Sequence, residues 1–230
     1  MKKLFVDFIQ FLKTGKTEHC ANKLSQNIFQ LGKLFLLFEI LFFASLLATV
    51  ICAAIFDFPR NHTLKWIRSL SPLWAFLIPN IIGPLLEEFT YRFWLRATKF
   101  TLTFSSLFIT YTLINNFLRS SYYSLQDTFL IEVSLSAGIA VLVFIVLSFE
   151  GVFVAVQIFW KQNARLLIYI SILSFGFSHI TNFPLQGWQF LYAPTMVLPQ
   201  LVMGAVWAFG RVKYGILFPI VIHIIHNSIL

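Results

Sequence analysis

Glu87, Glu88 and Arg92 directly follow an apolar run that is long enough to lie inside a membrane. An ionised side chain near the centre of a bilayer costs roughly 2.5–3.5 kcal/mol on insertion scales, so such residues are usually paired, turned towards a protein interior, or functional. The cluster therefore restricts the chain to folds that bury these three groups together. It also makes them the first candidates for a functional site.

The composition indicates an integral membrane protein. Hydrophobic residues make up 58% of the 230 residues, charged residues only 11%, and Phe alone occurs 28 times. A water-soluble domain of this size has about a quarter charged residues. Basic residues near membrane helix ends account for the net charge of +8, so we expect no nucleic-acid partner. Two cysteines are too few for a disulfide framework.

Apolar stretches of about 20 residues can cross the roughly 30 Å of hydrocarbon as helices. Helices are expected throughout, because lipid cannot satisfy open backbone groups and no alternating pattern indicates a barrel. The predicted fold is an all-α, polytopic transmembrane helical bundle. About seven spans are expected, at 34–56, 72–95, 100–118, 128–148, 166–182, 191–209 and 214–230.

The first 33 residues form a different kind of segment. Six lysines surround Phe5, Phe8, Ile9 and Leu12, which share one face at helical spacing. This pattern predicts an amphipathic helix at the interface of an anionic cytoplasmic leaflet. Residues 1–33 are therefore interpreted as a cytoplasmic amphipathic basic segment.

The distribution of basic residues also predicts the orientation of the chain. With the N-terminus in the cytoplasm, most Lys and Arg residues near span ends fall on the cytoplasmic side, as the positive-inside rule requires. The high content of Phe, Lys and Asn is typical of an AT-rich bacterial genome. The expected location is a bacterial cytoplasmic membrane.

Three spaced motifs carry the chemistry. Glu88 and Arg92 are four residues apart on a helix, with the acid on the N-terminal side, which favours an ion pair and leaves the neighbouring Glu87 free to face another surface. His179 shares a helical face with Phe175, four residues earlier. In the last span, His223 and Asn227 are also four residues apart. Similar depths in the membrane predict one polar pocket formed by three helices.

These motifs carry a resemblance to a known family. E-E-x-x-x-R, F-x-x-x-H and H-x-x-x-N, in this order on membrane helices, resemble the three motifs of the CPBP family, which comprises the type II CAAX prenyl endopeptidases and bacterial relatives also called Abi proteins. The resemblance implies an intramembrane endopeptidase of CAAX type. By that resemblance Glu87 activates water and His179 assists, while His223 and Asn227 stabilise the oxyanion. Glu88 and Arg92 organise the acidic helix.

The resemblance covers about 70–230, which is assigned as a CAAX-protease-like membrane domain, preceded by the first transmembrane helix and loop at 34–69. Glu87 and His179 are 92 residues apart, whereas the first two motifs of the relatives lie on neighbouring helices. Residues 100–160 are therefore interpreted as an inserted helical hairpin, with a variant arrangement of the bundle as the alternative. Simple packing is the favoured role for the insertion, and a substrate entrance or gate is the alternative.

Metal dependence is left open by the sequence. Glu87, His179 and either His223 or His226 can supply two imidazoles and one carboxylate to a zinc ion, and the family is often described as metalloprotease-like. However, H-E-x-x-H is absent, and a glutamate-dependent mechanism without metal fits the same residues. We expect no obligatory cofactor, with zinc as the alternative.

The expected partners are the lipid bilayer and a membrane-associated protein or peptide substrate, which the family resemblance allows to be prenylated. A rival hypothesis is a non-catalytic membrane protein. It would be either a bacteriocin-immunity protein that binds its target or a proton-coupled transporter with a buried acid and histidine relay. No duplicated halves, which are common in transporters, are visible in the sequence.

Overall fold

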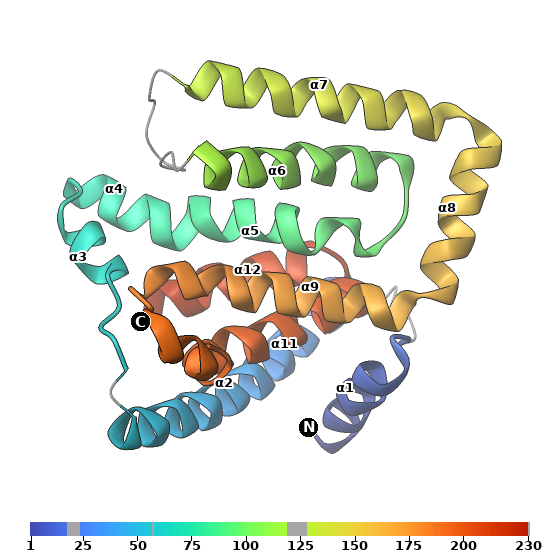
Figure 1. The fold of residues 1–230 in the computed structure, drawn as a ribbon. Helices are drawn as coiled ribbons and strands as arrows, with labels where there is room; N and C mark the ends of the chain where they lie inside the picture. The colour runs from blue at the N-terminus through green and yellow to red at the C-terminus, as the bar shows by residue number, and fades with distance from the viewer. Residues whose placement is uncertain (18–23, 57, 119–127, 230) are drawn as a thin grey trace.

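The computed structural model describes residues 1–17, 24–56, 58–118 and 128–229, and every element in these ranges is a helix (Figure 1). The elements, in chain order, are α1 (Lys2–Thr14), α2 (Leu24–Ile55), α3 (Thr63–Arg68), α4 (Pro72–Leu77), η1 (Ile78–Ile82), α5 (Gly83–Tyr91), η2 (Phe93–Leu95), α6 (Lys99–Leu118), α7 (Phe129–Ser148), α8 (Glu150–Gln162), α9 (Ala164–Ser178), η3 (His179–Asn182), η4 (Gly187–Tyr192), α10 (Ala193–Met196), α11 (Leu198–Tyr214) and α12 (Leu217–Ile229). The all-α fold class is confirmed.

The helices form two packed groups. In the first group α6 packs between α5 and α7, and in the second α11 packs against α2, α9 and α12 (Figure 1). Helix α8 runs across one end and leads the chain from α7 back to α9. Helix α5 also contacts α9 and α12, so it joins the two groups.

The chain is an integral membrane protein. Three described helical segments are long and apolar enough to cross a bilayer, namely Phe29–Ile55, Phe129–Ser148 and Ala164–Asn182. A fourth span is possible if Gly187–Met196 and Leu198–Tyr214, which meet at a bend of 41°, cross as one unit. The predicted count of seven is not confirmed. One reason lies at 72–95, where the chain is divided among α4, η1, α5 and η2 and forms no single long helix.

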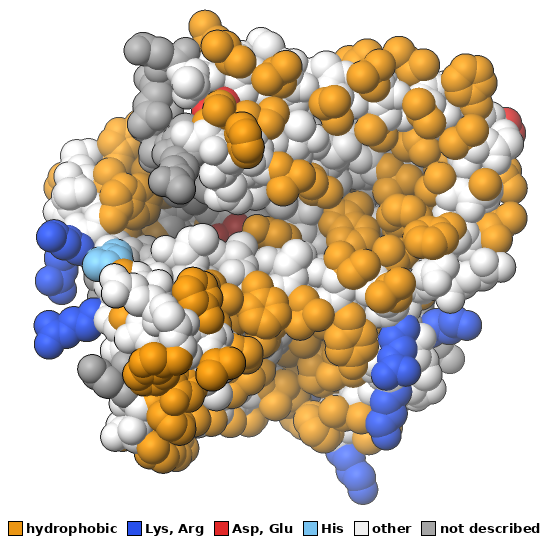
Figure 2. All heavy atoms as spheres, in the orientation of Figure 1, with side chains coloured by type: hydrophobic (Ala, Val, Ile, Leu, Met, Phe, Trp, Pro, Cys, Tyr) orange, Lys and Arg blue, Asp and Glu red, His pale blue; other side chains and the backbone are white. Residues whose placement is uncertain are grey.

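The outer surface agrees with a lipid environment. Large apolar side chains are exposed along α2 and α7, including Leu47, Ile51, Leu130, Val141 and Leu142, each more than half exposed. Figure 2 shows hydrophobic side chains over much of one face, with Lys and Arg gathered towards opposite ends of the molecule. Exposed apolar area of this extent is unstable in water and normal in hydrocarbon.

Helix α1 packs into the bundle core. Leu4, Phe8 and Phe11 are buried, and the rings of Phe8 and Phe11 lie 5.6 and 5.4 Å from the ring of Phe209. The predicted amphipathic face differs in detail, because Phe5 is 44% exposed. The buried face of α1 lies about one residue away from the predicted face, because α1 packs against helices α9 and α11. Whether the outer side of α1 also lies on a membrane surface stays a prediction.

Helices α9 and α11 approach each other closely at two glycines. A Cβ at Gly204 would lie 3.3 Å from the carbonyl oxygen of Ile172, and one at Gly176 would overlap with the side chain of Leu201. Small residues allow membrane helices to approach at backbone distance, where dispersion contacts accumulate. This contact matters for the site, because α9 carries Phe175 and leads into His179.

We predict that Gly204→Val destabilises the bundle by about 1–3 kcal/mol, because the added side chain must push apart two packed backbones. The measurement is the unfolding midpoint of the purified protein in detergent. Gly138→Val is the matched control, since a Cβ at Gly138 on α7 would meet no atom within 4 Å. Equal midpoints for the two variants would contradict the proposed close packing.

Candidate active site

The helix that carries the acidic motif begins with an irregular turn. Residues Ile78–Ile82 form a π-helix, in which the N–H of Gly83 donates to the carbonyl of Ile78. Pro84 has no N–H, so it cannot continue this pattern to the carbonyl of Pro79. The side chain of Asn227 supplies a donor in its place, with Nδ2 at 2.8 Å from that carbonyl oxygen. Helix α12 is thereby tied to the start of α5.

Glu88 and Arg92 form an ion pair that is sealed from solvent. Arg92 Nη1 donates to Glu88 Oε1 at 2.5 Å, and both side chains are 0% exposed. The guanidinium carbon lies 3.9 Å from the ring centroid of Phe175 and 5.1 Å from that of Trp207. Aromatic faces attract a cation and contribute more when the contact is dry. Removing one partner of such a pair costs about 3–5 kcal/mol, because the other charge stays buried.

His223 joins this pair from α12. Its Nδ1 lies 3.2 Å from Glu88 Oε1, and its ring stacks on the ring of Trp207 with centroids 3.8 Å apart. Its side chain is 3% exposed. Nδ1 of the imidazole therefore contacts a carboxylate and one ring face contacts an aromatic ring. Nε2 is the ring nitrogen that neither of these contacts uses.

Glu87 lies between two histidines. Its Oε2 is 3.5 Å from His223 Nε2, and its Oε1 is 4.0 Å from His179 Nε2. Unlike Glu88, it is 29% exposed. The two adjacent acids thus take different surroundings, because neighbouring residues on a helix point about 100° apart.

Hydrogen bonding determines which ring nitrogens carry protons. Nδ1 of His179 lies 2.9 Å from the carbonyl oxygen of Phe175, and a carbonyl only accepts, so this nitrogen carries the hydrogen. The same argument gives Nδ1 of His223 the hydrogen that it donates to Glu88. In both neutral rings Nε2 then has a lone pair. Three acceptors converge at Glu87, and a donor of two hydrogens, such as water, fits among them.

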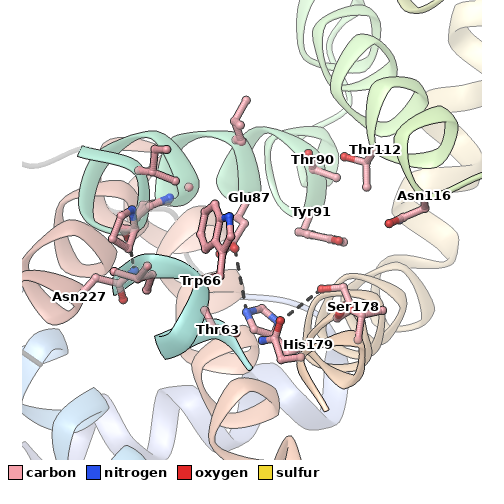
Figure 3. Close-up of a pocket in the computed structure, with 18 of the residues that line it drawn as sticks. Thr63, Trp66, Glu87, Thr90, Tyr91, Thr112, Asn116, Ser178, His179 and Asn227 are labelled. Atoms are coloured by element: carbon pink, nitrogen blue, oxygen red, sulfur yellow. Dashed lines mark hydrogen bonds and ion pairs between the residues drawn. The ribbon is translucent and has the colours of Figure 1, made fainter. Parts of the chain in front are cut away.

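A cavity of about 540 Å³ opens beside Glu87. Figure 3 shows Glu87 and His179 facing each other, with Thr112 and Asn116 of α6 on one side and Trp66 of α3 on the other. Asn227, His179 and Glu87 line this space, whereas Glu88, Arg92 and His223 are buried behind its wall. The site therefore consists of three residues that face the cavity and three buried residues behind them that hold them in position.

The structure brings together all six predicted site residues: Glu87, Glu88, Arg92, His179 and His223 in one polar network, and Asn227 on the same cavity. The remaining membrane histidine, His226, lies elsewhere. Its Nδ1 is 2.9 Å from Glu39 Oε1, and its ring packs edge-on against Phe38 and Phe42. It does not join the site, so the alternative ligand set that includes it is wrong.

The sequence interpretation allowed the insertion to line a substrate entrance but did not single out the residues that do so. Phe108, Tyr111, Thr112 and Asn116 of α6 line the cavity, although simple packing was the favoured role for this hairpin. Their spacing of three and four residues marks one face of a helix, which is the signal that could have found them. The buried Glu132 of α7 does follow the packing interpretation, since it accepts from Asn115 of α6 at 3.1 Å.

A zinc ion is not supported by the arrangement of donors. In the described residues no group of three or more His, Cys, Asp or Glu side chains is placed to hold a metal ion. Tetrahedral zinc ligands at about 2.0–2.2 Å from the metal are roughly 3.4 Å apart. The Glu87–His223 separation of 3.5 Å meets this spacing, but the Glu87–His179 separation of 4.0 Å is too long.

Comparison with known proteins agrees with this geometry. The family model described as type II CAAX prenyl endopeptidase Rce1-like matches residues 69–229, a range that contains every residue of the site. No curated protein and no solved structure gives a significant match. The chain belongs to the Rce1-like family of type II CAAX prenyl endopeptidases.

Proposed function

We propose that the protein is an intramembrane endopeptidase, and that it hydrolyses a peptide bond of a membrane-associated protein or peptide with water activated by Glu87. The observation that carries this proposal is the placing of the Glu87 carboxylate between two imidazole Nε2 atoms, with Glu87 and His179 on the wall of a cavity large enough for a peptide segment and His223 directly behind it. Membership of the family independently favours a protease.

The hydrogen-bond pattern gives each acceptor a role. A water molecule at Glu87 donates one hydrogen to the carboxylate and the second to His179 Nε2, which aligns its lone pair for attack on a substrate carbonyl. Glu87 takes the proton as the oxygen–carbon bond forms. It then delivers the proton to the leaving amine as the carbon–nitrogen bond breaks. No serine is needed, and Ser178 Oγ already donates to the carbonyl of Phe175 at 2.7 Å.

The developing oxyanion needs hydrogen-bond donors, and two side chains of the site can supply them. Asn227 uses one hydrogen of its amide on the Pro79 carbonyl and has a second. His223 can donate from Nε2 while it holds the proton that Glu87 has taken from water, since Nε2 lies 3.5 Å from Glu87 Oε2, and it returns that proton to Glu87 before the amine leaves. The Glu88 carboxylate on Nδ1 stabilises the doubly protonated ring. Losing one oxyanion donor typically costs about 100–1000-fold in rate.

The first test compares protein termini in cells that carry wild-type protein with those in cells that carry Glu87→Gln at equal membrane abundance. We expect a set of termini that depends on Glu87, and a loss of about 100- to 10,000-fold in their rate of formation, since the variant cannot accept a proton. Glu150→Gln is the matched control, because Glu150 is exposed and, among the described residues, forms an ion pair with Lys99 at 3.5 Å. Its termini should equal those of wild type.

The same comparison separates the rival hypotheses. An immunity protein that works by binding keeps its protective effect in Glu87→Gln and yields no termini that depend on Glu87. A proton-coupled transporter shows a Glu87-dependent response to the proton gradient, again without new termini. Either result would replace proteolysis as the proposed function.

A second prediction concerns Glu88. In Glu88→Gln an amide oxygen at the Oε1 position can still accept from Arg92 and His223, which both contact that atom, but the negative charge is lost. The doubly protonated ring of His223 then lacks the carboxylate that stabilises it as an oxyanion donor. Because losing one oxyanion donor typically costs about 100–1000-fold in rate, we expect kcat to fall by about 100-fold or more, with KM nearly unchanged, on a peptide that spans a Glu87-dependent cleavage site. An unchanged kcat would remove Glu88 from the positioning role.

A further inference from the structure

Helix α2 lies outside the range that the family model matches, which begins at residue 69, yet it packs against the helices that carry the site. It contacts α11, which carries Trp207, and α12, which carries His223 and Asn227 (Figure 1). The contact with α12 includes a polar pair, Glu39 and His226, that the proposed mechanism does not use. Ionisable residues within membrane helices are costly, so such a pair is expected to have a function.

The imidazole of His226 is held by side chains from neighbouring turns of α2. Its Nδ1 lies 2.9 Å from Glu39 Oε1. The rings of Phe38 and Phe42 meet it edge to face, with centroids 4.7 and 4.5 Å from its own. The side chain of His226 is 2% exposed. This ring therefore cannot turn away from α2 without losing a hydrogen bond and two aromatic contacts.

His226 is fixed relative to two residues of the candidate site. It directly precedes Asn227 and follows His223 by three residues on α12, so the three side chains move together when the helix rotates. Asn227 Nδ2 donates to the carbonyl of Pro79 at 2.8 Å, and His223 Nδ1 lies 3.2 Å from Glu88 Oε1. These contacts join α12 to η1 and α5, whereas the contact of His226 joins it to α2. The rotation of α12 is thus set by two separate parts of the bundle.

A small rotation of α12 is enough to disturb the site. Side-chain ends lie about 5–6 Å from a helix axis, so a rotation of about 20° moves them by about 2 Å. The 2.8 Å hydrogen bond of Asn227 does not survive a shift of that size. Misplacing a catalytic group by about 1 Å can cost about 100-fold in rate. The contact with α2 therefore affects His223 and Asn227 through the backbone of α12.

The same part of α2 also reaches His223 through aromatic rings. Phe38 is 0% exposed, and its ring centroid lies 5.5 Å from that of Trp207. Trp207 in turn stacks on the ring of His223, with centroids 3.8 Å apart. Phe38 thus contacts both His226 and the ring that covers His223, so α2 supports α12 at two points.

We propose that Glu39 is a positioning residue of the candidate active site. Its hydrogen bond to His226 fixes the rotation of α12, which places His223 beside Glu87 and Asn227 at the cavity. The functional unit then extends beyond the matched domain to α2. The effect on catalysis rests on the proposed function, whereas the placement of His223 is testable without it.

The test uses full-length protein with substitutions that separate the hydrogen bond from folding. Glu39→Leu removes the bond, and Glu39→Gln keeps an oxygen that can accept from His226. A double variant, Glu39→Leu with His226→Leu, removes both polar groups, so neither is left buried without the other. Thr49→Val is the matched control, because Thr49 also lies on α2 and its Oγ1 donates to the carbonyl of Thr195 on α10 at 2.9 Å.

We expect kcat to fall at least about tenfold in Glu39→Leu and in the double variant, with KM nearly unchanged, on a peptide that spans a Glu87-dependent cleavage site. The double variant should be no slower than Glu39→Leu, because the second substitution has no bond left to remove. Glu39→Gln should restore most of the kcat, and Thr49→Val should keep the wild-type value.

Three kinetic results would overturn the inference. The first is a Glu39→Leu variant whose unfolding midpoint falls while the kcat of the folded protein stays at the wild-type value, since the pair would then serve stability alone. The second is a double variant with wild-type kcat, because the defect of Glu39→Leu would then come from an unpaired imidazole. The third is a Glu39→Gln variant as slow as Glu39→Leu.

A second readout does not depend on catalysis. The ring of His223 lies over the face of Trp207, whose ring current shifts the NMR signals of the His223 ring protons. In protein isotopically labelled at its five histidines, we expect Glu39→Leu to move these signals and Thr49→Val to leave them in place. A His223→Gln sample assigns them.

The two readouts separate this inference from the proposed function. Unmoved His223 signals in Glu39→Leu would refute the positioning role even if the protein is a protease. If no Glu87-dependent termini exist, proteolysis fails, while moved His223 signals still support the placement of α12 by Glu39.

Discussion

The buried pair of Glu88 and Arg92 is the interaction on which the site depends. A lone charge in this environment is expensive, so the pair persists only where both members are held together and shielded. Phe175 of α9 and Trp207 of α11 supply that shield, and Nδ1 of His223 on α12 contacts the same carboxylate oxygen as Arg92. One ion pair thereby specifies how four helices meet.

This arrangement also explains why two adjacent glutamates can differ in function. Glu88 accepts from Arg92 and His223 at Oε1 and has no exposed surface, whereas Glu87 faces the cavity and meets two imidazole edges that carry lone pairs. The first carboxylate serves as a fixed negative charge within the fold. The second is left with unfilled hydrogen-bonding capacity, which is the property that a proton acceptor requires.

Much of this could be predicted from residue patterns, and the failures have physical causes. The i,i+4 spacings placed Glu88 with Arg92 and His223 with Asn227 on common faces, and the cost of charge in lipid predicted that the motifs converge. Gly83 and Pro84 indicate a kink in this span, but patterns of hydropathy do not show its geometry, so the π turn at Ile78–Ile82 was not identified. The partner of Glu39 was also missed, because His226 is 187 residues away and no local spacing relates the two.

The hydrogen bond from Asn227 to the carbonyl of Pro79 joins two residues that are 148 positions apart in the sequence. It joins the helix that starts the acidic motif to the last helix that the structure describes, and His223 lies one turn before it. During synthesis every other element of the site enters the membrane before α12. Until α12 docks, Glu88 lacks an imidazole partner and the π turn lacks its side-chain donor, so a partly made chain holds an incomplete site. Assembly of the candidate site is therefore coupled to the completion of folding.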